Sequence, residues 1–530
     1  MNLSVIQNRT KGQVIVVGAG IAGLAVAVRL AHEGYAVTVL EQHKDPGGKM
    51  RVMPSETGLI DAGPTVLTMR PVFEELFKSV GESIDKHLNL IRQKILARHW
   101  WPDGSTLDLF DDYETSQQAI YDFAGLKGFK EFQSFCQKTK RLFETFDIPM
   151  MQTGEPSQWD MAKLLMQQPS LARDIAPLHS MAGKLAQYFT DPRLAQLFGR
   201  YATYVGGSPY RSPALLCLIW QAEARGVWCV KGGMHELAKT LVSLAKERHT
   251  EFVFNTKVKR ILVNDGQANG VLLENGEQRM ADIVVFNGEP RALATGALGP
   301  EFQGIAKESL KDERSLSARV WSFDASPNGL DLLHHNVFFA GNPKSEFDDI
   351  MAGRMPRDPT IYVCAQDRGL NADYPARERF EIILNAPALS EAQPVKEEFE
   401  KCRTLTMRTL ESFGLTFTPQ PSEKALTTPQ DFAAMFPASD GSLYGQSPHG
   451  LTAAFRRPTN RTMIPGLYLA GGGTHPGAGV PMATLSARHA VEAILKDRIS
   501  TSPSPQTATL GGMSMASAAP QNAQFRSSDS

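Results

Sequence analysis

A glycine-rich stretch near the start of the chain limits the possible folds more than any other feature of the sequence. Residues 14–41 read VIVVGAGIAGLAVAVRLAHEGYAVTVLE, where an apolar run leads directly into the pattern GxGxxG. A segment with helical spacing and a second apolar run follow. The pattern therefore predicts a strand, a tight turn, a helix and a parallel strand, an order typical of a fold that binds a dinucleotide.

Each glycine of this turn has an expected physical role. Gly18 permits the tight turn, Gly20 lets a pyrophosphate approach the backbone, and Gly23 lets the helix and the strand pack closely. The free N–H groups at the helix N-terminus then face the phosphate charge. Glu41 ends the second strand, where a carboxylate can accept hydrogen bonds from a ribose. A glycine-rich turn without a ligand is the alternative, but the four elements in register favour dinucleotide binding.

A second glycine loop near the end of the chain repeats this design. Residues 467–481 read LYLAGGGTHPGAGVP, and a helix is expected over 483–495. Two such elements at opposite ends of a chain indicate one nucleotide-binding fold that is assembled from both. A cofactor that is held from both ends is long and fixed, which favours FAD over an exchangeable NAD.

The composition indicates a globular protein with more than one domain. The chain has 530 residues, of which 42% are hydrophobic and 21% are charged, and its formal net charge is −1. Without a basic stripe, nucleic-acid binding has no electrostatic support. The five cysteines are scattered and form no CxxC pair, so neither a disulfide framework nor a metal site is predicted, and a reducing cytoplasm is expected. The apolar stretch over 14–28 is too short to cross a bilayer.

The middle of the chain alternates between helical and strand patterns. Residues 70–203 have mostly helical spacing, interrupted by a predicted β-hairpin over 95–110 with a Pro-Asp-Gly turn. The apolar run PALLCLIW at 213–220 predicts either a core helix or a surface that docks on a bilayer, and the core helix is favoured. Short strands are predicted over 251–286, and a second region of strands with one helix over 300–445.

These motifs resemble those of a known superfamily. The residues from 14 to 49 resemble the N-terminal signature of the FAD-dependent amine oxidase and phytoene desaturase superfamily, and THPGAGVP is similar to the signature of bacterial carotenoid desaturases. Within that family, the segments DAGPTVLTMR, HWWPDGSTLDLF and HPGAGVPMATLS look most like 1-hydroxycarotenoid 3,4-desaturases, also called methoxyneurosporene dehydrogenases. The resemblance covers about residues 14 to 496.

The resemblance implies an α/β architecture, in which an α+β substrate domain is inserted into a Rossmann-type FAD-binding domain of the glutathione reductase and amine oxidase type. The FAD-binding parts are expected at 13–70, 226–295 and 446–498. A helical, membrane-facing substrate part is expected at 71–225 and a substrate-domain sheet at 296–445. A flexible N-terminus (1–12) and a disordered tail (499–530), which is rich in Ser, Pro, Thr, Gln and Ala, complete the expected organisation.

The family pattern also assigns residues to FAD. The ADP part is expected to contact Gly18, Gly20, Gly23, Glu41, Gly48 and Lys49. Adenine is expected beside the backbone of Val258, and the flavin side is expected along Gly63, Pro64, Thr65, Gly473, Val480, Pro481 and Met482. Lys49 stands where the family often has arginine, which keeps the charge but loses the bidentate fork. No resident metal is implied.

The activity implied by the resemblance is desaturation of an acyclic carotenoid, at the C3–C4 bond of 1-hydroxy- or 1-methoxy-carotenoids such as 1-hydroxyneurosporene, with hydride transfer to flavin N5. Hydride loss from the allylic C4 leaves a cation that the polyene stabilises, so no catalytic triad is expected. The candidates for a base or a positioning group are His475, Arg211, His99, Asp103 and His235. His475 is preferred because its loop is expected to reach the flavin, and Arg211 is the second choice.

Other functions remain open at this point. A phytoene or C30 carotene desaturase or isomerase of the same family is one alternative, and an isoprenoid carrier without redox activity is another. The expected partners are a long carotenoid, a membrane surface and a terminal electron acceptor such as oxygen or a quinone. The expected location is the cytoplasm, with peripheral attachment to the inner or intracytoplasmic membrane.

Overall fold

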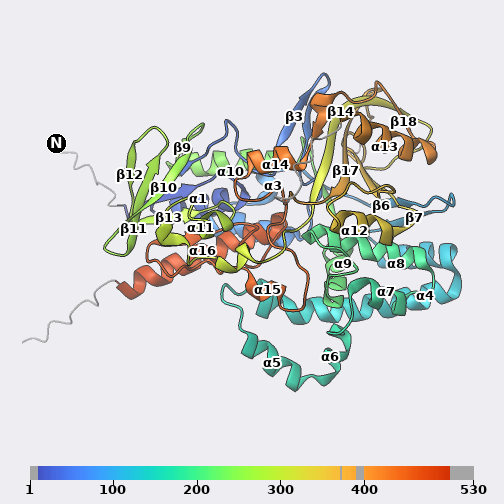
Figure 1. Cartoon of the computed structure of the whole chain (residues 1–530), viewed down its shortest axis with the longest axis horizontal. Coiled ribbons are helices and arrows are strands. Elements are labelled where there is room, and N and C mark those ends of the chain that lie inside the picture. The colour runs from blue at the N-terminus through green and yellow to red at the C-terminus, as the bar shows by residue number, and fades with distance from the viewer. Residues whose placement is uncertain (1–9, 371–372, 390–398, 502–530) are drawn as a thin grey trace, which may run out of the picture.

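A parallel sheet forms one end of the molecule and contains both glycine loops. The computed structural model describes residues 10–370, 373–389 and 399–501, and Figure 1 shows this sheet and its helices on the left. The strand order is β20-β13-β1-β2-β9, and every neighbouring pair is parallel. The bounds are β1 (Gln13–Val17), β2 (Ala36–Leu40), β9 (Glu251–Val253), β13 (Ile283–Phe286) and β20 (Leu467–Leu469). These strands come from the three segments assigned to the FAD-binding part.

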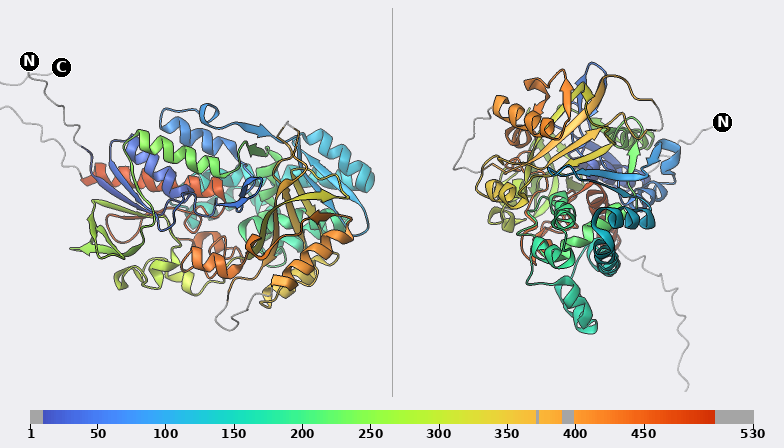
Figure 2. Two further views of the ribbon diagram at one scale, coloured as in Figure 1. Left: turned by 90° about the horizontal axis from the view of Figure 1, so that it is seen from above. Right: turned by 90° about the vertical axis from the view of Figure 1, so that its right-hand side faces the viewer.

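Helices cover this sheet, and a small antiparallel sheet flanks it. The helix α1 (Ile21–His32) packs against α10 (His235–Glu247) and α16 (Val480–Thr501), and its residues 22–31 are all buried. In the left view of Figure 2, α1 and α16 lie alongside each other although they are at opposite ends of the chain. The flanking elements are α2 (Arg70–Ser79), α3 (Ile84–His87), α11 (Arg291–Ala294), β10 (Val258–Asn264), β11 (Gln267–Leu273) and β12 (Gln278–Met280).

A mixed sheet of eight strands forms the other half of the molecule. Its strand order is β18-β14-β17-β16-β15-β6-β7, with β19 paired to β14. The strand bounds are β6 (Ile95–Trp100), β7 (Thr106–Phe110), β14 (Ser317–Asn328), β15 (His335–Phe338), β16 (Ile361–Ala365), β17 (Glu378–Ala386), β18 (Thr416–Thr418) and β19 (Leu426–Thr427). The helices around it are α12 (Pro343–Met351), α13 (Phe399–Ser412) and α14 (Pro429–Met435), whereas α15 (Ala453–Arg456) lies closer to α16 and the helical layer (Figure 1).

A helical layer lies below the large sheet in Figure 1. It contains α4 (Tyr113–Phe146), α5 (Gln158–Gln167), α6 (Pro169–Ile175), α7 (Met181–Tyr188), α8 (Pro192–Gly199), α9 (Trp220–Ala224), the 3-10 helices Arg200–Val205 and Ala214–Ile219, and a π-helical turn Asp147–Met151. Its core is aromatic, because Phe132, Phe135, Phe198 and Trp220 stack around one another. Among the described residues, no helix is both long and apolar enough to cross a membrane.

A small hairpin and a two-stranded antiparallel sheet complete the fold. The strand β3 (Val52–Ser55) forms a hairpin with β4 (Gly58–Asp61), whereas β5 (Leu90–Arg92) pairs with the distant strand β8 (Trp228–Val230). The strand β8 immediately precedes the helix α10 of the nucleotide-binding end.

Several local predictions are confirmed and some details differ. The strand, turn, helix and strand over 14–41 form as expected, and so does the hairpin over 95–110. This hairpin joins the large sheet through β6 and β15, although it lies within the segment assigned to the helical part. The run 213–220 forms helical turns with Ala214, Cys217 and Trp220 buried, as the core interpretation required. The helix α16 extends to Thr501, and residues 1–9 and 502–530, which belong to the predicted terminal segments, lie outside the described residues.

Candidate active site

The first glycine turn forms a cradle at the N-terminus of α1. Gly18 has a φ of 102°, and its N–H donates to the carbonyl oxygen of Leu40 at 2.8 Å. A Cβ atom on Gly23 would lie 2.1 Å from the oxygen of Gly18, so only glycine permits this helix to pack so closely on the turn. A Cβ atom on Gly20 would lie 2.8 Å from Oδ1 of Asn287. The backbone of the turn is therefore open to a ligand, and the helix N–H groups point to it.

Glu41 connects this cradle to the strand that ends beside it. Its buried carboxylate accepts hydrogen bonds from the backbone N–H groups of Ala19 at 2.6 Å and His43 at 2.9 Å. The side chain also lines the large cavity described below. A carboxylate has about four lone-pair positions, so two remain available to the hydroxyl groups of a ribose.

A cluster of cations lies next to the cradle. The ammonium of Lys49 donates to the carbonyl oxygen of Leu443 at 2.5 Å, Arg314 forms an ion pair with Glu289 at 3.3 Å, and Arg457 donates to the carbonyl oxygen of Gly472 at 2.7 Å. Burial, together with the charges of Arg314 and Arg457, lowers the pKa of Lys49 to about 8, although the Glu289 carboxylate opposes them.

Three cations and one carboxylate leave this cluster with excess positive charge. A guanidinium nitrogen of Arg314, Nη1, is also buried without a hydrogen-bond partner among the described residues. Of the three cations, Lys49 lines the cavity itself, and a diphosphate there would supply the missing negative charge, so the cluster fits the pyrophosphate of a dinucleotide.

The second glycine loop closes the cradle from the other end of the chain. Gly471, Gly472 and Gly473 follow β20 and lead to the start of α16. A Cβ atom on Gly473 would lie 2.5 Å from Cδ of Pro290, so a side chain there would displace the neighbouring loop. The other predicted cofactor residues on the cavity wall are Gly48, Gly63, Pro64, Thr65, Val258, Val480 and Pro481. Gly23 and Met482 are not among the lining residues.

One cavity of about 1210 Å³ runs from this cradle into the space between the large sheet and the helical layer. Beyond the glycine loops its wall is mostly apolar, and the lining rings include Phe189, Phe339 and Phe347. A long apolar ligand can therefore lie with one end against the cofactor cradle and the rest between the two layers.

A charged cluster interrupts this apolar wall. Arg200 and Tyr204 line the cavity, and both bind the carboxylate of Glu223, which lies behind them. The hydroxyl of Tyr204 donates to Glu223 at 2.5 Å and accepts a hydrogen bond from Arg200 at 2.6 Å. Tyr201, which is fully buried, donates to the second oxygen of Glu223 at 2.6 Å. Burial alone would lower the pKa of Arg200, but the two phenols and the carboxylate outweigh it and raise the pKa, so the guanidinium stays charged.

Two buried carboxyl groups also line the cavity. Burial raises the pKa of Glu346 to about 7, although Asn385 and Thr360 donate hydrogen bonds to its oxygens at 3.0 and 2.7 Å. Glu381 lies in the middle of β17, and its oxygens have no hydrogen-bond partner among the described residues. Burial, followed by the charge of Asp61, raises the pKa of Glu381 well above its ordinary value.

These polar residues of the cavity were not predicted from the sequence. Arg200, Tyr204 and Glu223 belong to helical segments in which polar residues are common, and nothing in their spacing marks them. Glu381 carried a weak signal, because it is the charged residue in the otherwise apolar run of β17, Phe380 to Leu384.

The residues proposed for catalysis from sequence lie elsewhere. None of His475, Arg211, His99, Asp103 and His235 is among the residues that line the large cavity. The geometry therefore gives no support to the expectation that His475 reaches the flavin. Its Nε2 is hydrogen bonded to the carbonyl oxygen of Thr153 at 2.8 Å, and burial lowers the pKa of His475 to about 4.

The other four have structural contacts of the same kind. Arg211 is half exposed and forms an ion pair with Glu313 at 2.8 Å, beside a separate cavity of about 400 Å³. Rings of His99 and His235 donate to backbone carbonyl oxygens, and Asp103 caps its own turn. The catalytic roles of His475 and Arg211 thus remain predictions.

Comparisons with known proteins agree with this geometry. A family model described as flavin containing amine oxidoreductase matches residues 21–319 and 395–495. The chain is similar to the hydroxyneurosporene desaturase of Cereibacter sphaeroides, with 51% identity over 490 residues that cover 92% of this chain and 99% of that protein. It is also similar to the protein of the same name from Rhodobacter capsulatus, with 48% identity and coverage of 93% and 99%.

A solved structure shows the same fold at low identity. Cyclohexylamine oxidase from Brevibacterium oxydans IH-35A superposes with a TM-score of 0.55 at 16% identity, covering 92% of this chain and 99% of that one.

The cradle and the cation cluster, together with these matches, define a flavin-dependent oxidoreductase with FAD as its cofactor. The chain belongs to the flavin-containing amine oxidoreductase family, and within it to the carotenoid desaturases. The family, the fold class and the cofactor predicted from sequence are thereby confirmed.

Proposed function

We propose that this enzyme desaturates the C3–C4 bond of an acyclic 1-hydroxy- or 1-methoxy-carotenoid such as 1-hydroxyneurosporene. The observation that carries the proposal is the single cavity, which joins the FAD cradle to a long apolar space with one charged cluster on its wall. The relatives named hydroxyneurosporene desaturase support the same substrate class.

The charged cluster fits the position of the substrate hydroxyl group. In such a carotenoid, C1, which carries the hydroxyl, is only three bonds from C4, so the hydroxyl must lie close to the flavin when C4 does. Tyr204 and Arg200 offer an acceptor oxygen and charged N–H donors within an apolar wall. A buried cluster of this kind favours a hydroxylated carotenoid over an analogue that lacks the hydroxyl, because Nε of Arg200 is buried without a hydrogen-bond partner among the described residues.

Bound FAD supplies the hydride acceptor for this chemistry. The apolar rings around the polyene exclude water, and the polyene itself stabilises the positive charge that follows hydride loss from C4. A proton must then leave C3. Glu346 is a cavity carboxyl group with a pKa of about 7, so a useful fraction is ionised near neutral pH and can accept that proton.

A direct test of the reaction is anaerobic incubation of the purified holoenzyme with 1-hydroxyneurosporene in lipid vesicles. We expect the flavin absorbance to bleach without added nicotinamide, and a 3,4-didehydro product to appear in equal amount. Parallel incubations contain phytoene and a C30 carotene. Bleaching with either of these, but not with the hydroxylated carotenoid, would contradict the proposal. Readmission of oxygen, or of a quinone under argon, then identifies the acceptor that restores the flavin colour.

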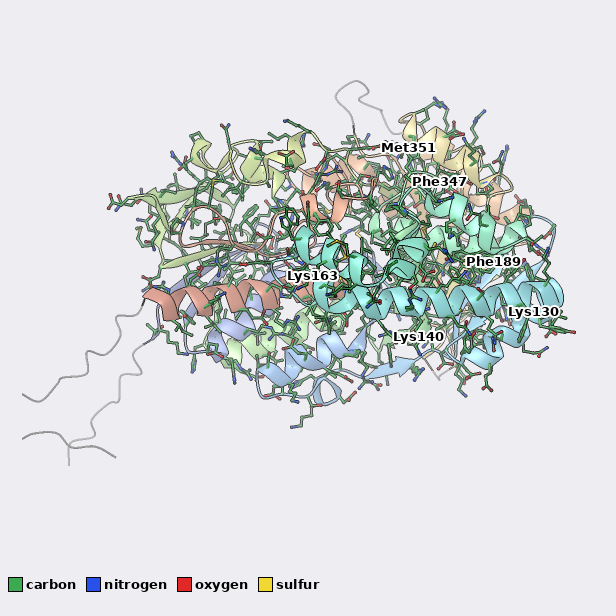
Figure 3. The ribbon with its side chains drawn as sticks, turned by 90° about the horizontal axis from the view of Figure 1, so that it is seen from below. Lys130, Lys140, Lys163, Phe189, Phe347 and Met351 are labelled. Atoms are coloured by element: carbon green, nitrogen blue, oxygen red, sulfur yellow. The ribbon has the colours of Figure 1, made fainter. Side chains whose placement is uncertain are left out.

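We also propose peripheral attachment to a membrane through α5 and α6. These helices extend away from the body in Figure 1, and two exposed apolar side chains mark this projection: Trp159 on α5 is 85% exposed, and Leu178 in the turn after α6 is 95% exposed. Figure 3 shows Lys163 on α5 and Lys140 on α4 near this projection, and cationic residues next to exposed apolar ones favour anionic lipid headgroups. A carotenoid dissolved in the bilayer also requires an enzyme that reaches the membrane.

Vesicle flotation tests this surface. The double variant Trp159→Ser and Leu178→Ser should lose most of its binding to vesicles that contain anionic lipid, since two large apolar side chains no longer enter the interface. Met280→Ser removes a 54% exposed apolar side chain on β12 and serves as the matched control. Equal binding of the double variant and the control would contradict attachment through α5 and α6.

A further inference from the structure

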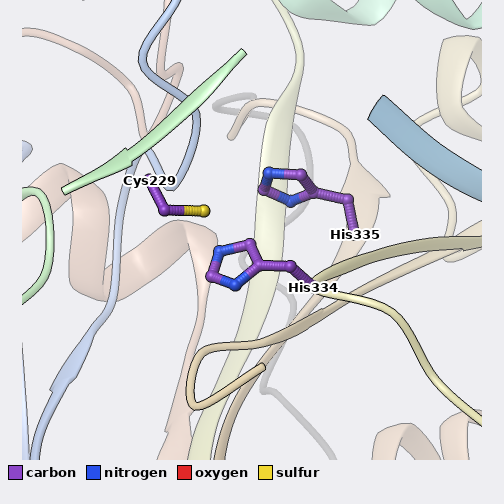
Figure 4. Close-up of side chains that lie close together, drawn as sticks. All are labelled: Cys229, His334 and His335. Atoms are coloured by element: carbon purple, nitrogen blue, oxygen red, sulfur yellow. The ribbon is translucent and has the colours of Figure 1, made fainter. Parts of the chain in front are cut away.

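Four side chains that bind soft metal ions meet behind the wall of the large cavity. Cys229 comes from β8, His334 and His335 from the start of β15, and Cys364 from β16. The ligand atoms of the first three lie within 4.8 Å of one another, and Figure 4 shows the sulfur of Cys229 pointing toward the two imidazole rings. The sulfur of Cys364 lies 3.5 Å from Nε2 of His334. All four residues are buried.

The hydrogen bonds of both imidazoles leave one nitrogen of each ring directed at this cluster. Nδ1 of His334 donates to the carbonyl oxygen of Arg368 at 2.6 Å, which leaves its Nε2 lone pair for the cluster. Nδ1 of His335 is 2.6 Å from the hydroxyl of Tyr362, and that hydroxyl is 2.8 Å from Oγ1 of Thr65. Nε2 of His335 is buried without a hydrogen-bond partner among the described residues. Metal-binding histidines typically have their second nitrogen fixed in this manner.

We propose that Cys229, Cys364, His334 and His335 form a buried tetrahedral zinc site. Two thiolates and two imidazoles are a common donor set for structural zinc, and bonds of about 2.0 to 2.3 Å place tetrahedral ligand atoms roughly 3.3 to 3.8 Å apart. The ligand atoms of Cys229, His334 and His335 lie within 4.8 Å of one another and need only small side-chain movements to reach this range, and Cys364 would complete the set from its position 3.5 Å from Nε2 of His334. Binding releases the two thiol protons, so the complex of zinc with both thiolates is neutral.

The position of the site indicates its role. It ties β8, which precedes α10 of the nucleotide-binding end, to two strands of the large sheet. It also connects to the cavity wall through His335, Tyr362 and Thr65, of which the last two line the cavity. The metal would therefore fix the two halves of the enzyme relative to each other on the flavin side, without taking part in the redox step.

Metal analysis of the full-length, FAD-containing protein tests the site. We expect about one zinc per chain after purification without chelator, and replacement by cobalt should produce the visible d–d bands and the thiolate charge-transfer band of a tetrahedral sulfur-ligated ion. Cys229→Ser and His335→Gln should lose the zinc and these bands. Tyr362→Phe should keep the ligands but weaken zinc binding by roughly 10- to 100-fold.

Cys217→Ser is the matched control, because Cys217 is equally buried but belongs to the aromatic core of the helical layer. Wild-type protein without stoichiometric zinc after growth in zinc-supplemented medium would overturn the proposal. So would zinc that all variants retain equally, since the metal would then be bound elsewhere. If the ligand variants do not fold, the cobalt spectrum of the wild-type protein decides alone, because a spectrum without thiolate charge transfer excludes the site.

Discussion

Replacement of Tyr204 with phenylalanine removes one hydroxyl group from the charged cluster and leaves the ring in place. This hydroxyl donates to Glu223 and accepts from Arg200, and both partners are charged. Hydrogen bonds to charged groups contribute about 1.5 to 3 kcal/mol each, which corresponds to roughly 10- to 150-fold in a rate or binding constant. We expect kcat/KM for 1-hydroxyneurosporene to fall by a factor in this range.

The comparison of two substrates isolates the recognition of the hydroxyl group. With neurosporene, which lacks the hydroxyl, kcat/KM of Tyr204→Phe should stay at the wild-type level or rise, because the cluster is less polar. The assay is product formation in vesicles at several substrate concentrations, normalised to bound flavin. An equal fall in kcat/KM for both substrates would refute the reasoning.

Tyr201→Phe provides the control for general damage to the cluster. Its hydroxyl also donates to Glu223, at 2.6 Å, but its side chain is fully buried and does not line the cavity. The free energy of unfolding should fall by a similar amount in both variants, about 1.5 to 3 kcal/mol. The preference for the hydroxylated substrate should change in Tyr204→Phe alone, and a similar change in Tyr201→Phe would remove Tyr204 from the recognition site.

Four further outcomes follow from the site. Gly473→Val should abolish FAD retention, because its Cβ would meet Pro290 at 2.5 Å; normal flavin content on purification would contradict this. The wild-type protein should bind FAD more weakly above about pH 8, where Lys49 loses its proton. The variant Lys49→Met should bind FAD more weakly than the wild type at pH 7 and should not show this decrease; fluorescence titration at several pH values measures both. Wild-type activity should rise as the pH increases through about 7, because Glu346 ionises there. If the activity of Glu346→Gln rises with pH in the same way, Glu346 is not the base. His475→Ala should lower the free energy of unfolding by about 1 to 3 kcal/mol, because the carbonyl of Thr153 loses its donor, with turnover per bound flavin unchanged; lower turnover at wild-type stability would restore its catalytic role.

The parts of the fold that the sequence predicted are those whose signals are local. The strand, turn, helix and strand over 14–41 form because the apolar spacing and the glycines act within a few residues of one another. The hairpin over 95–110 forms for the same reason, around its Pro-Asp-Gly turn. Its attachment to β15 depends on residues more than two hundred positions later, and no local pattern records that pairing.

The site was predictable where a motif limits the backbone, and it was not predictable where side chains meet through the tertiary fold. A glycine motif predicts the local backbone because no other residue fits there, as the collision of a Gly23 side chain with the carbonyl oxygen of Gly18 shows. The direction of His475 depends on the carbonyl of Thr153, which lies far away in the chain, so the motif could not place its ring. The cluster around Cys229 has no metal-binding spacing, and the adjacent pair His334-His335 was the one visible sign of it.

The order of strands in the parallel sheet has a consequence for how the enzyme is made. The strand β1 leaves the ribosome early, but its neighbour β13 follows only after residue 283, and β20 pairs with β13 later still. A nascent chain therefore has an open sheet edge, and half a cradle, for most of its synthesis. FAD can be captured only when translation is nearly complete, and a chain cut before β20 should accumulate as aggregate or be degraded, with no flavin bound. FAD should therefore bind only to chains whose synthesis is nearly complete and in which the N-terminal and C-terminal glycine loops have come together.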